Sequence, residues 1–164
     1  MPREALIRPV AVAELGEIMH RIIAVRAAAY EPWNGPRSPE QRRDEAARWL
    51  EKIADRVRPA IFVAVDGDCV VGYVWGYEED PRCFSISHIG VLPERGRRGI
   101  GRALLKQCES LSRDRGYEVV STSTYDHFSG MRDLLLQEGY AISGITKEES
   151  AGHQNARLEL TKPL

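Results

Sequence analysis

The densest chemical signal in this chain is a short run in which arginine alternates with glycine. The run reads Arg95-Gly96-Arg97-Arg98-Gly99-Ile100-Gly101-Arg102. Glycine lets a backbone approach a ligand closely, the first N–H groups of a helix are unpaired donors, and guanidinium groups suit phosphate oxygens. Because a helix N-terminus also carries about half a positive charge, the turn predicts a binding site for a diphosphate.

Two other phosphate-binding motifs fit this turn poorly. Gly96 and Gly101 have the spacing of a nucleotide-hydrolase loop, but Arg102 and Ala103 stand where Lys and Ser or Thr would bind phosphate and magnesium. The glycine order is the reverse of that in dinucleotide-binding turns, and the turn follows a late strand. The remaining alternative is a plain solvated turn.

The elements that position the turn follow from hydrophobic periodicity and chain breakers. Strands are expected at 6–12, 61–65, 69–77, 84–91, 117–124, 140–146 and 157–161. Helices are expected from 15 to before Pro32, from 39 with a stripe of Leu50, Ile53 and Val57, from 99 to Gly116, and at 129–138. Hairpins mixed with crossover helices predict one α/β domain over 1–164 with a mixed sheet.

Two local signals are specific. Asp66-Gly67 between two apolar runs favours a tight hairpin turn, because glycine readily adopts positive dihedrals. Ser38-Pro39-Glu40-Gln41 has the N-cap, first-turn proline and capping-box glutamine of a helix start.

Composition limits the partners. The 164 residues carry a formal net charge of -1, so the basic turn is a local anion site, and no basic stripe with aromatics extends it for nucleic acid. No apolar run approaches the roughly 20 residues that span a bilayer, so no membrane partner is expected. The three cysteines show no paired motif and the start shows no secretory pattern, which favours the cytoplasm. No metal site is expected.

The segments around the turn resemble the coenzyme-A signature of the GNAT acyltransferase superfamily. They are Val91-x-Pro93, Gly99-Ile100-Gly101, Ala103-Leu104-Leu105, Glu138-Gly139-Tyr140 and Leu160-Thr161-Lys162-Pro163-Leu164. One departure is Gly96, which stands where the family has Gln or Arg. The resemblance implies a mixed, mostly antiparallel sheet of about seven strands with about four helices. It also implies that acetyl-CoA is held by backbone groups at Ile89 and Val91 and by residues 95–102.

The resemblance further implies direct transfer of the acetyl group to an amine in a ternary complex. An alkyl ammonium has no free lone pair at neutral pH, so a general base is expected. His88 is the first candidate, because it lies on the strand beside the expected thioester and imidazole titrates near neutral pH. Glu79 and its neighbour Glu78 are the second, and a structural histidine is the alternative.

The family's proton donor to the departing thiolate is a Tyr in the last helix. Leu135 stands at that position, and Phe128 replaces the family's Asn at the helix start. Neither residue can carry the acid role. Tyr125 and His127, in the turn before that helix, are the substitutes, and water is the alternative.

Trp33 and Tyr77 are the candidate acceptor-binding residues, because an aromatic face suits a cation or ring. Trp33 lies in the expected loop 31–36. Trp75 and Tyr77, on the strand expected at 69–77, are expected to line the same acceptor-binding cleft or, alternatively, to lie in the core. The acceptor is expected to be an amine of a small molecule or peptide. Alternatives are a longer acyl-CoA, another acceptor, or a regulatory module that binds coenzyme A without turnover. The resemblance also allows a homodimer through the late strands.

Overall fold

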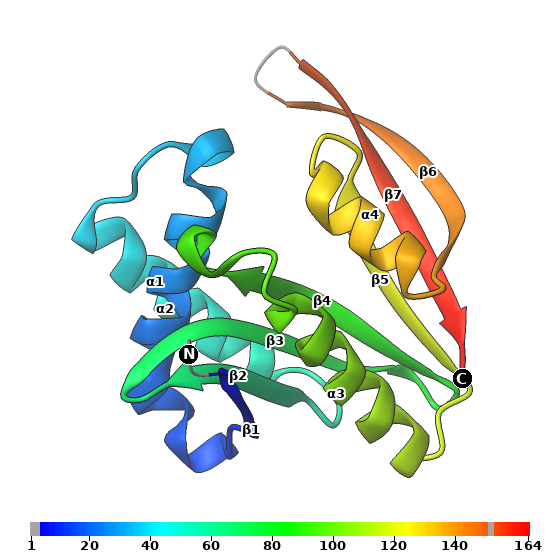
Figure 1. Ribbon diagram of the computed structural model, residues 1–164, viewed down its shortest axis with the longest axis horizontal. Helices are drawn as coiled ribbons and strands as arrows, with labels where there is room; N and C mark the ends of the chain where they lie inside the picture. Colours follow the sequence, from blue (N-terminus) through cyan, green and yellow to red (C-terminus); the bar gives the residue numbers. More distant parts are fainter. Residues whose placement is uncertain (1–3, 151–152) are drawn as a thin grey trace.

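The computed structural model describes residues 4–150 and 153–164, and Figure 1 shows their arrangement. The strands are β1 (Leu6–Pro9), β2 (Ala60–Asp66), β3 (Cys69–Asp80), β4 (Cys83–Val91), β5 (Val119–Tyr125), β6 (Ala141–Ser150) and β7 (His153–Pro163). The helices are α1 (Leu15–Asn34), α2 (Pro39–Ala54), α3 (Ile100–Asp114) and α4 (Ser129–Gln137), with short 3₁₀ turns at Val12–Glu14 and Pro93–Arg95. Over these residues the predicted element order is confirmed.

The strands form one seven-stranded sheet in the order β1-β2-β3-β4-β5-β7-β6. Every neighbouring pair is antiparallel except β4 and β5, which are parallel. The mixed, mostly antiparallel sheet expected from the sequence is therefore confirmed. Helices α3 and α4 cover one face and α1 and α2 cover the other (Figure 1).

Each face has its own apolar core. On one face Leu104 and Cys108 of α3 pack with Phe84 and Leu160 of the sheet. On the other face the stripe of α1 packs with α2 and with the aromatic residues of β3. Within the described ranges, no helix is both long and apolar enough to cross a membrane.

Helix α1 is longer than expected. The end placed before Pro32 is wrong, because the helix continues to Asn34 and Gly35 closes it with a φ of 71°. The Gly35 N–H donates to the Glu31 carbonyl at 2.8 Å, so the last turn is closed although Pro32 offers no N–H of its own. As a result Trp33 lies on a helix and not in a loop.

The start of α2 is as predicted. Ser38 Oγ accepts from the Gln41 N–H at 3.1 Å, and Gln41 Oε1 accepts from the Ser38 N–H at 2.9 Å, so both halves of the capping box are present. The predicted stripe is partly wrong. Val57 lies beyond the helix end and is 57% exposed, and the buried apolar residues of α2 are Trp49 and Ile53.

Two boundaries near the turns also differ from expectation. The β2–β3 hairpin turns at Gly67 and Asp68, since Asp66 still pairs with Cys69, and Gly67 has a φ of 60°. Strands β6 and β7 extend well beyond 140–146 and 157–161. Their outer parts are polar and therefore lack the alternation that marks a half-buried strand.

Candidate active site

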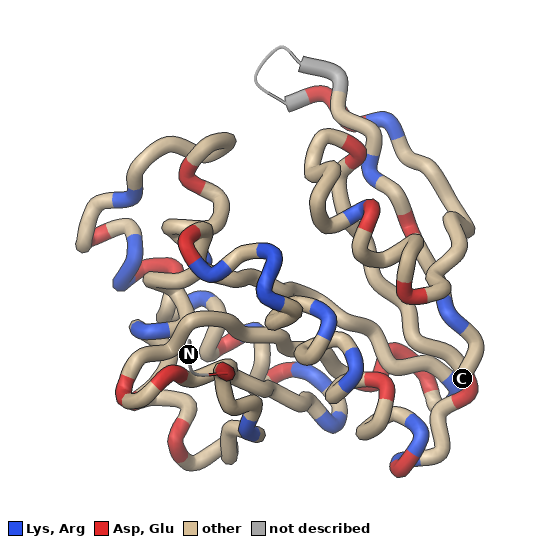
Figure 2. Tube along the Cα trace, viewed as in Figure 1, with Lys and Arg blue, Asp and Glu red and all other residues tan. Residues whose placement is uncertain are grey.

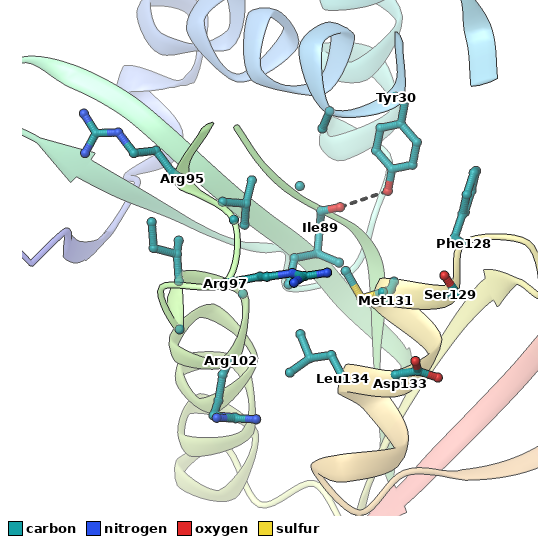
Figure 3. Close-up of a pocket in the computed structure, with 18 of the residues that line it drawn as sticks. Tyr30, Ile89, Arg95, Arg97, Arg102, Phe128, Ser129, Met131, Asp133 and Leu134 are labelled. Atoms are coloured by element: carbon teal, nitrogen blue, oxygen red, sulfur yellow. Dashed lines mark hydrogen bonds between the residues drawn. The ribbon is translucent and has the colours of Figure 1, made fainter. Parts of the chain in front are cut away.

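A cleft opens where β4 and β5 stop pairing. Their parallel pairing ends at Ile86 and Thr122, and β4 then continues to Val91 with β5 diverging from it (Figure 1). A cavity of about 680 Å³, which we call the first cavity, lies along this part of β4. Its walls come from the end of α1, β4, the glycine turn, α3 and α4 (Figure 3).

The glycine turn presents a run of unpaired backbone donors to this cavity. The Gly96 N–H donates to the Pro93 carbonyl at 3.1 Å, and the Ala103 N–H donates to the Gly99 carbonyl at 2.9 Å. Between these two bonds, the amides of residues 97–102 have no acceptor among the described residues. Unpaired amides at a helix start, reinforced by the helix dipole, attract an anion. Arg95 and Gly96 differ from the other expected residues of the turn because their amides already donate, to the Leu92 and Pro93 carbonyls.

Backbone conformation explains why glycine stands at 99. Gly99 is the N-cap of α3 and has a φ of 79°, in the left-handed region that favours glycine. A Cβ added there would meet no described atom within 4 Å, so the space in front of the turn is open. Arg97 also has a positive φ, of 61°, without being glycine. Such strain is concentrated at functional sites in proteins.

The four arginines of the turn fall into two groups, those with and those without a carboxylate partner. Figure 2 shows a concentration of Lys and Arg positions where the turn leads into α3. Arg95 pairs with Asp66 at 2.5 Å, and Arg102 pairs with Glu138. Arg97 and Arg98 are exposed and form no ion pair within the described part of the chain. Arg95, Arg97 and Arg102 all line the first cavity (Figure 3). Of these three, Arg95 and Arg102 are paired with carboxylates, and Arg97 is not. Arg97 is therefore the cation most available to a phosphate.

The exposed edge of β4 supplies further backbone groups. The Leu92 N–H donates to the Val71 carbonyl of β3 at 2.9 Å. Because alternate residues of a strand direct their polar groups to opposite sides, Ile89 and Val91 direct theirs away from β3 and into the cleft. The Ile89 carbonyl accepts from the Tyr30 hydroxyl at 3.0 Å (Figure 3). Strand β4 thus offers the cleft the donors expected at Ile89 and Val91.

These residues fit a coenzyme A molecule. A Cβ on Gly101 would stand 3.2 Å from Leu134 Cδ2, so glycine keeps open the gap between the starts of α3 and α4. The unpaired amides suit a diphosphate, and the open edge of β4 suits an amide-bearing arm that pairs as a strand does. Residues 97–102 would hold the phosphates, and Ile89 and Val91 would hold the arm.

An aromatic wall closes the other end of the first cavity. Tyr30, Trp33 and Phe128 line it, with ring centroids of Trp33 and Phe128 4.7 Å apart and those of Tyr30 and Phe128 5.3 Å apart. Trp33 is 51% exposed, so it is not a core residue. Burial raises the pKa of Tyr30, which stays a neutral hydroxyl donor.

The aromatic residues of β3 do not join that wall. Trp75 is 2% exposed and belongs to the core between the sheet and α1 and α2. Tyr77 lines a second cavity, on the α2 side of the sheet, with the Arg56 guanidinium 4.4 Å from its ring centroid. The expectation that Tyr77 shares a cleft with Trp33 is not met, because the two residues lie on different cavities.

His88 is half-buried within a ring of aromatic side chains. Its Nδ1 lies 2.9 Å from the Tyr73 hydroxyl, and its ring centroid lies 4.9 Å from Trp49 and 5.4 Å from Tyr30. Burial, and then the nearby Arg26 and Lys52 charges, lower the pKa of His88 from 6.5 to about 3. A base with so low a pKa accepts a proton poorly at neutral pH, which weighs against the expected role.

We predict that His88 makes the protein less stable in mild acid. The unfolded chain protonates this imidazole near pH 6.5 and the folded chain only near pH 3, so stability is fully present above pH 6.5 and falls between these values. The fall for one proton is at most about 1.4 kcal/mol per pH unit, and it is smaller here because the ring is not fully enclosed. Urea unfolding of His88→Asn and the parent at pH 5 and 7 measures it. Parallel pH dependences in the two proteins would contradict the prediction.

The other proton-transfer candidates lie away from the first cavity. Glu79 accepts from Ser121 Oγ at 3.0 Å and lines the second cavity. The Tyr125 hydroxyl donates to Glu148 at 2.9 Å, and this bond raises the pKa of Tyr125 and makes it a weaker acid. His127 stacks on Tyr125 with ring centroids 5.5 Å apart.

Tyr30 and Phe128 are cavity residues that the sequence did not assign. Nothing in the sequence around Tyr30 on α1, or around Phe128 at the start of α4, indicated a ligand. Their ring contact depends on α1 continuing past Pro32 toward α4. Within the described residues no three His, Cys, Asp or Glu side chains gather as a metal site requires.

Comparisons with known proteins agree with this geometry. A family model described as the acetyltransferase (GNAT) family matches residues 22–140. No curated protein sequence matches the chain. Three solved structures illustrate the likeness in fold, which at these identities shows the fold alone.

A ribosomal-protein-alanine N-acetyltransferase from Brucella melitensis is 21% identical, with 97% of this chain and 99% of that chain covered and a TM-score of 0.71. A candidate acetyltransferase from Salmonella typhimurium, solved with its cofactor acetyl-CoA, is 16% identical, with 98% and 94% covered and a TM-score of 0.74. An aminoglycoside 6'-N-acetyltransferase complexed with coenzyme A is 16% identical, with 96% of each chain covered and a TM-score of 0.74.

Proposed function

Because the chain belongs to the GNAT family of acetyl-CoA-dependent N-acetyltransferases, we propose that it transfers the acetyl group of acetyl-CoA directly to a primary amine of a small molecule or peptide. The observation that carries this proposal is the run of unpaired amides at residues 97–102, which faces the cleft beside the unpaired edge of β4.

In this proposal the phosphates bind the amides of the glycine turn, with Arg97 and Arg98 as the cations nearest to them. The pantetheine arm lies along β4 and pairs with backbone groups of Ile89 and Val91. The thioester then lies near the point where β4 and β5 diverge. A fixed N–H at that point stabilises the oxyanion that develops as the amine attacks, more than it stabilises the substrate.

Proton transfer in this proposal depends mainly on water. The amine must lose a proton and the departing thiolate must gain one, and neither Glu79 nor Tyr125 lines the first cavity. His88 directly precedes Ile89 on β4, and its bond to Tyr73 supports a role in positioning this strand. We propose that positioning of the two substrates and oxyanion stabilisation supply most of the rate.

Calorimetric titration and a thiol-release assay test the proposal. Acetyl-CoA should bind at sub-millimolar concentration, and S-acetylpantetheine, which lacks the diphosphate, should bind at least about a hundredfold more weakly because it loses several charge-assisted hydrogen bonds. Thiol should be released when an acceptor amine is added. No binding of acetyl-CoA would overturn the proposal, and binding without release by any amine would favour the regulatory alternative.

Arg97 provides a more selective test of the phosphate site. We expect Arg97→Ala to raise the Kd for acetyl-CoA about five- to tenfold, because this side chain lines the cavity and lacks a carboxylate partner among the described residues. Arg95→Ala should change the Kd less, since Arg95 already pairs with Asp66. The Arg97 effect should shrink in high salt, which screens exposed charges. Equal effects of the two substitutions would contradict this assignment.

A further inference from the structure

The second cavity has a volume of about 470 Å³ and lies beside α2, over β4, β5 and β7. Since α2 covers the face of the sheet opposite to α3 and α4, this cavity lies on the opposite side of the cleft from the glycine turn (Figure 1). It is lined by Ile86 and Thr122, the last residues that pair between β4 and β5, and by Ser87 and Ser123, which follow them. It therefore begins where the two strands diverge.

One wall of the second cavity is cationic. Lys52 lies in the last turn of α2, and Arg56 lies two residues beyond the helix end at Ala54. Both are exposed, and neither forms an ion pair within the described part of the chain. Lys52 Nζ lies 5.8 Å from the Trp75 ring centroid, and the Arg56 guanidinium lies 4.4 Å from that of Tyr77. These aromatic faces hold the two cations in place without neutralising them.

The strand register shows where each of these cations lies along the second cavity. Trp75, beneath Lys52, pairs with His88, which lies beyond the last β4–β5 pair. Tyr77, beneath Arg56, pairs with Ser85, which lies within the stretch where β4 and β5 still pair. An anion bound between them would lie a few ångströms from the divergence point.

The opposite wall is acidic. Glu159 of β7 pairs in register with Ser123, lines the cavity, and forms no ion pair among the residues described. Its neighbour Arg157 differs, because it bonds Ser123 Oγ at 3.1 Å and lies 3.9 Å from Glu148. Strands β4 and β7 are separated by β5, so their backbones lie two strand spacings, about 10 Å, apart. The side chains that project from both strands leave room between them for a small molecule.

We propose that the second cavity binds the acceptor and that the acceptor is zwitterionic: a primary amine that also carries an oxyanion, as α-amino acids and O-phosphorylated amines do. Lys52 and Arg56 bind the oxyanion, Glu159 attracts the ammonium group, and the serine hydroxyls of β4 and β5 bind polar substituents. This inference rests on the proposed acetyl transfer.

The test compares matched acceptors with the full chain and saturating acetyl-CoA. The probes are the protein amino acids with their methyl esters, and O-phosphoethanolamine with ethanolamine. For the preferred acceptor, kcat/KM should be at least about tenfold higher for the oxyanion-bearing form, since a charged hydrogen bond is lost in its partner. If the amino acids are preferred over their methyl esters, the acceptor's oxyanion is a carboxylate. If O-phosphoethanolamine is preferred over ethanolamine, the oxyanion is a phosphate.

Variants locate the effect in the second cavity. Lys52→Gln and Arg56→Gln should raise KM for the oxyanion-bearing form about tenfold to a hundredfold and leave KM for its partner and the Kd of acetyl-CoA unchanged. Arg43→Gln, on an exposed position of α2 that lines neither cavity, is the matched control and should change neither constant. Titration of the acceptor into the coenzyme-A complex gives a readout independent of turnover.

The outcomes separate this inference from the proposed function. If acetyl-CoA does not bind, the proposed function fails. If it binds but no oxyanion-bearing amine is bound or acetylated, or if esters serve as well as acids, the inference alone is overturned. Unchanged KM values in both Lys52→Gln and Arg56→Gln would also overturn it.

Discussion

Replacing Gly99 with alanine should weaken acetyl-CoA binding by about a hundredfold, whereas replacing Gly116 with alanine should leave binding unchanged. At Gly99 the new Cβ enters the open space in front of the turn, and the strained φ of 79° turns the neighbouring amides away from the phosphates. Loss of two or more such hydrogen bonds corresponds to about this factor in Kd.

Gly116 is a close control because it ends the same helix. Its φ is 83°, and a Cβ there would likewise meet no described atom within 4 Å. Both variants should therefore lose a similar stability, about 1 kcal/mol, from left-handed strain. Calorimetric titration with acetyl-CoA and thermal unfolding measure the two effects. Equal Kd values for both variants would show that the turn is only structural.

Replacing Glu45 with alanine should lower the free energy of unfolding by about 3 kcal/mol, because the variant leaves the Arg26 charge largely buried without a partner. Glu45 pairs with Arg26 at 2.8 Å, and the two side chains are 7% and 18% exposed. The Arg26 guanidinium also lies 5.6 Å from the ring centroid of Tyr30, whose hydroxyl bonds the Ile89 carbonyl. The variant should thus disturb the cleft as well as the fold.

A double variant distinguishes the cost of an unpaired charge from the loss of packing. Arg26→Met combined with Glu45→Leu should recover most of the lost stability, because apolar residues of similar size often replace a buried ion pair at little cost. Urea unfolding of the parent, Glu45→Ala and the double variant measures this. A double variant no more stable than Glu45→Ala would contradict the explanation.

Local sequence patterns predicted the parts of the site that depend on backbone conformation. Gly99, which has a positive φ at the N-cap of α3, and the capping box at Ser38 act within a few residues of themselves, so their spacing is sufficient evidence. The family match over 22–140 confirms the resemblance, and the motifs at 91–105 and 138–140 lie within that range.

Partners far apart in sequence could not be predicted in this way. Arg95 and Arg102 were expected at the phosphates, but Asp66 and Glu138 pair with them across 29 and 36 positions. A charge pattern does not reveal which distant carboxylate the fold brings near. The aromatic enclosure of His88 was missed for the same reason, since its members come from α1, α2 and β3.

A crystal structure of the chain grown with acetyl-CoA tests the central claim most directly. The diphosphate oxygens should accept hydrogen bonds from main-chain amides within residues 97–102, with the acyl arm running along Ile89 and Val91. Coenzyme seated elsewhere, with those amides still unpaired, would contradict the account.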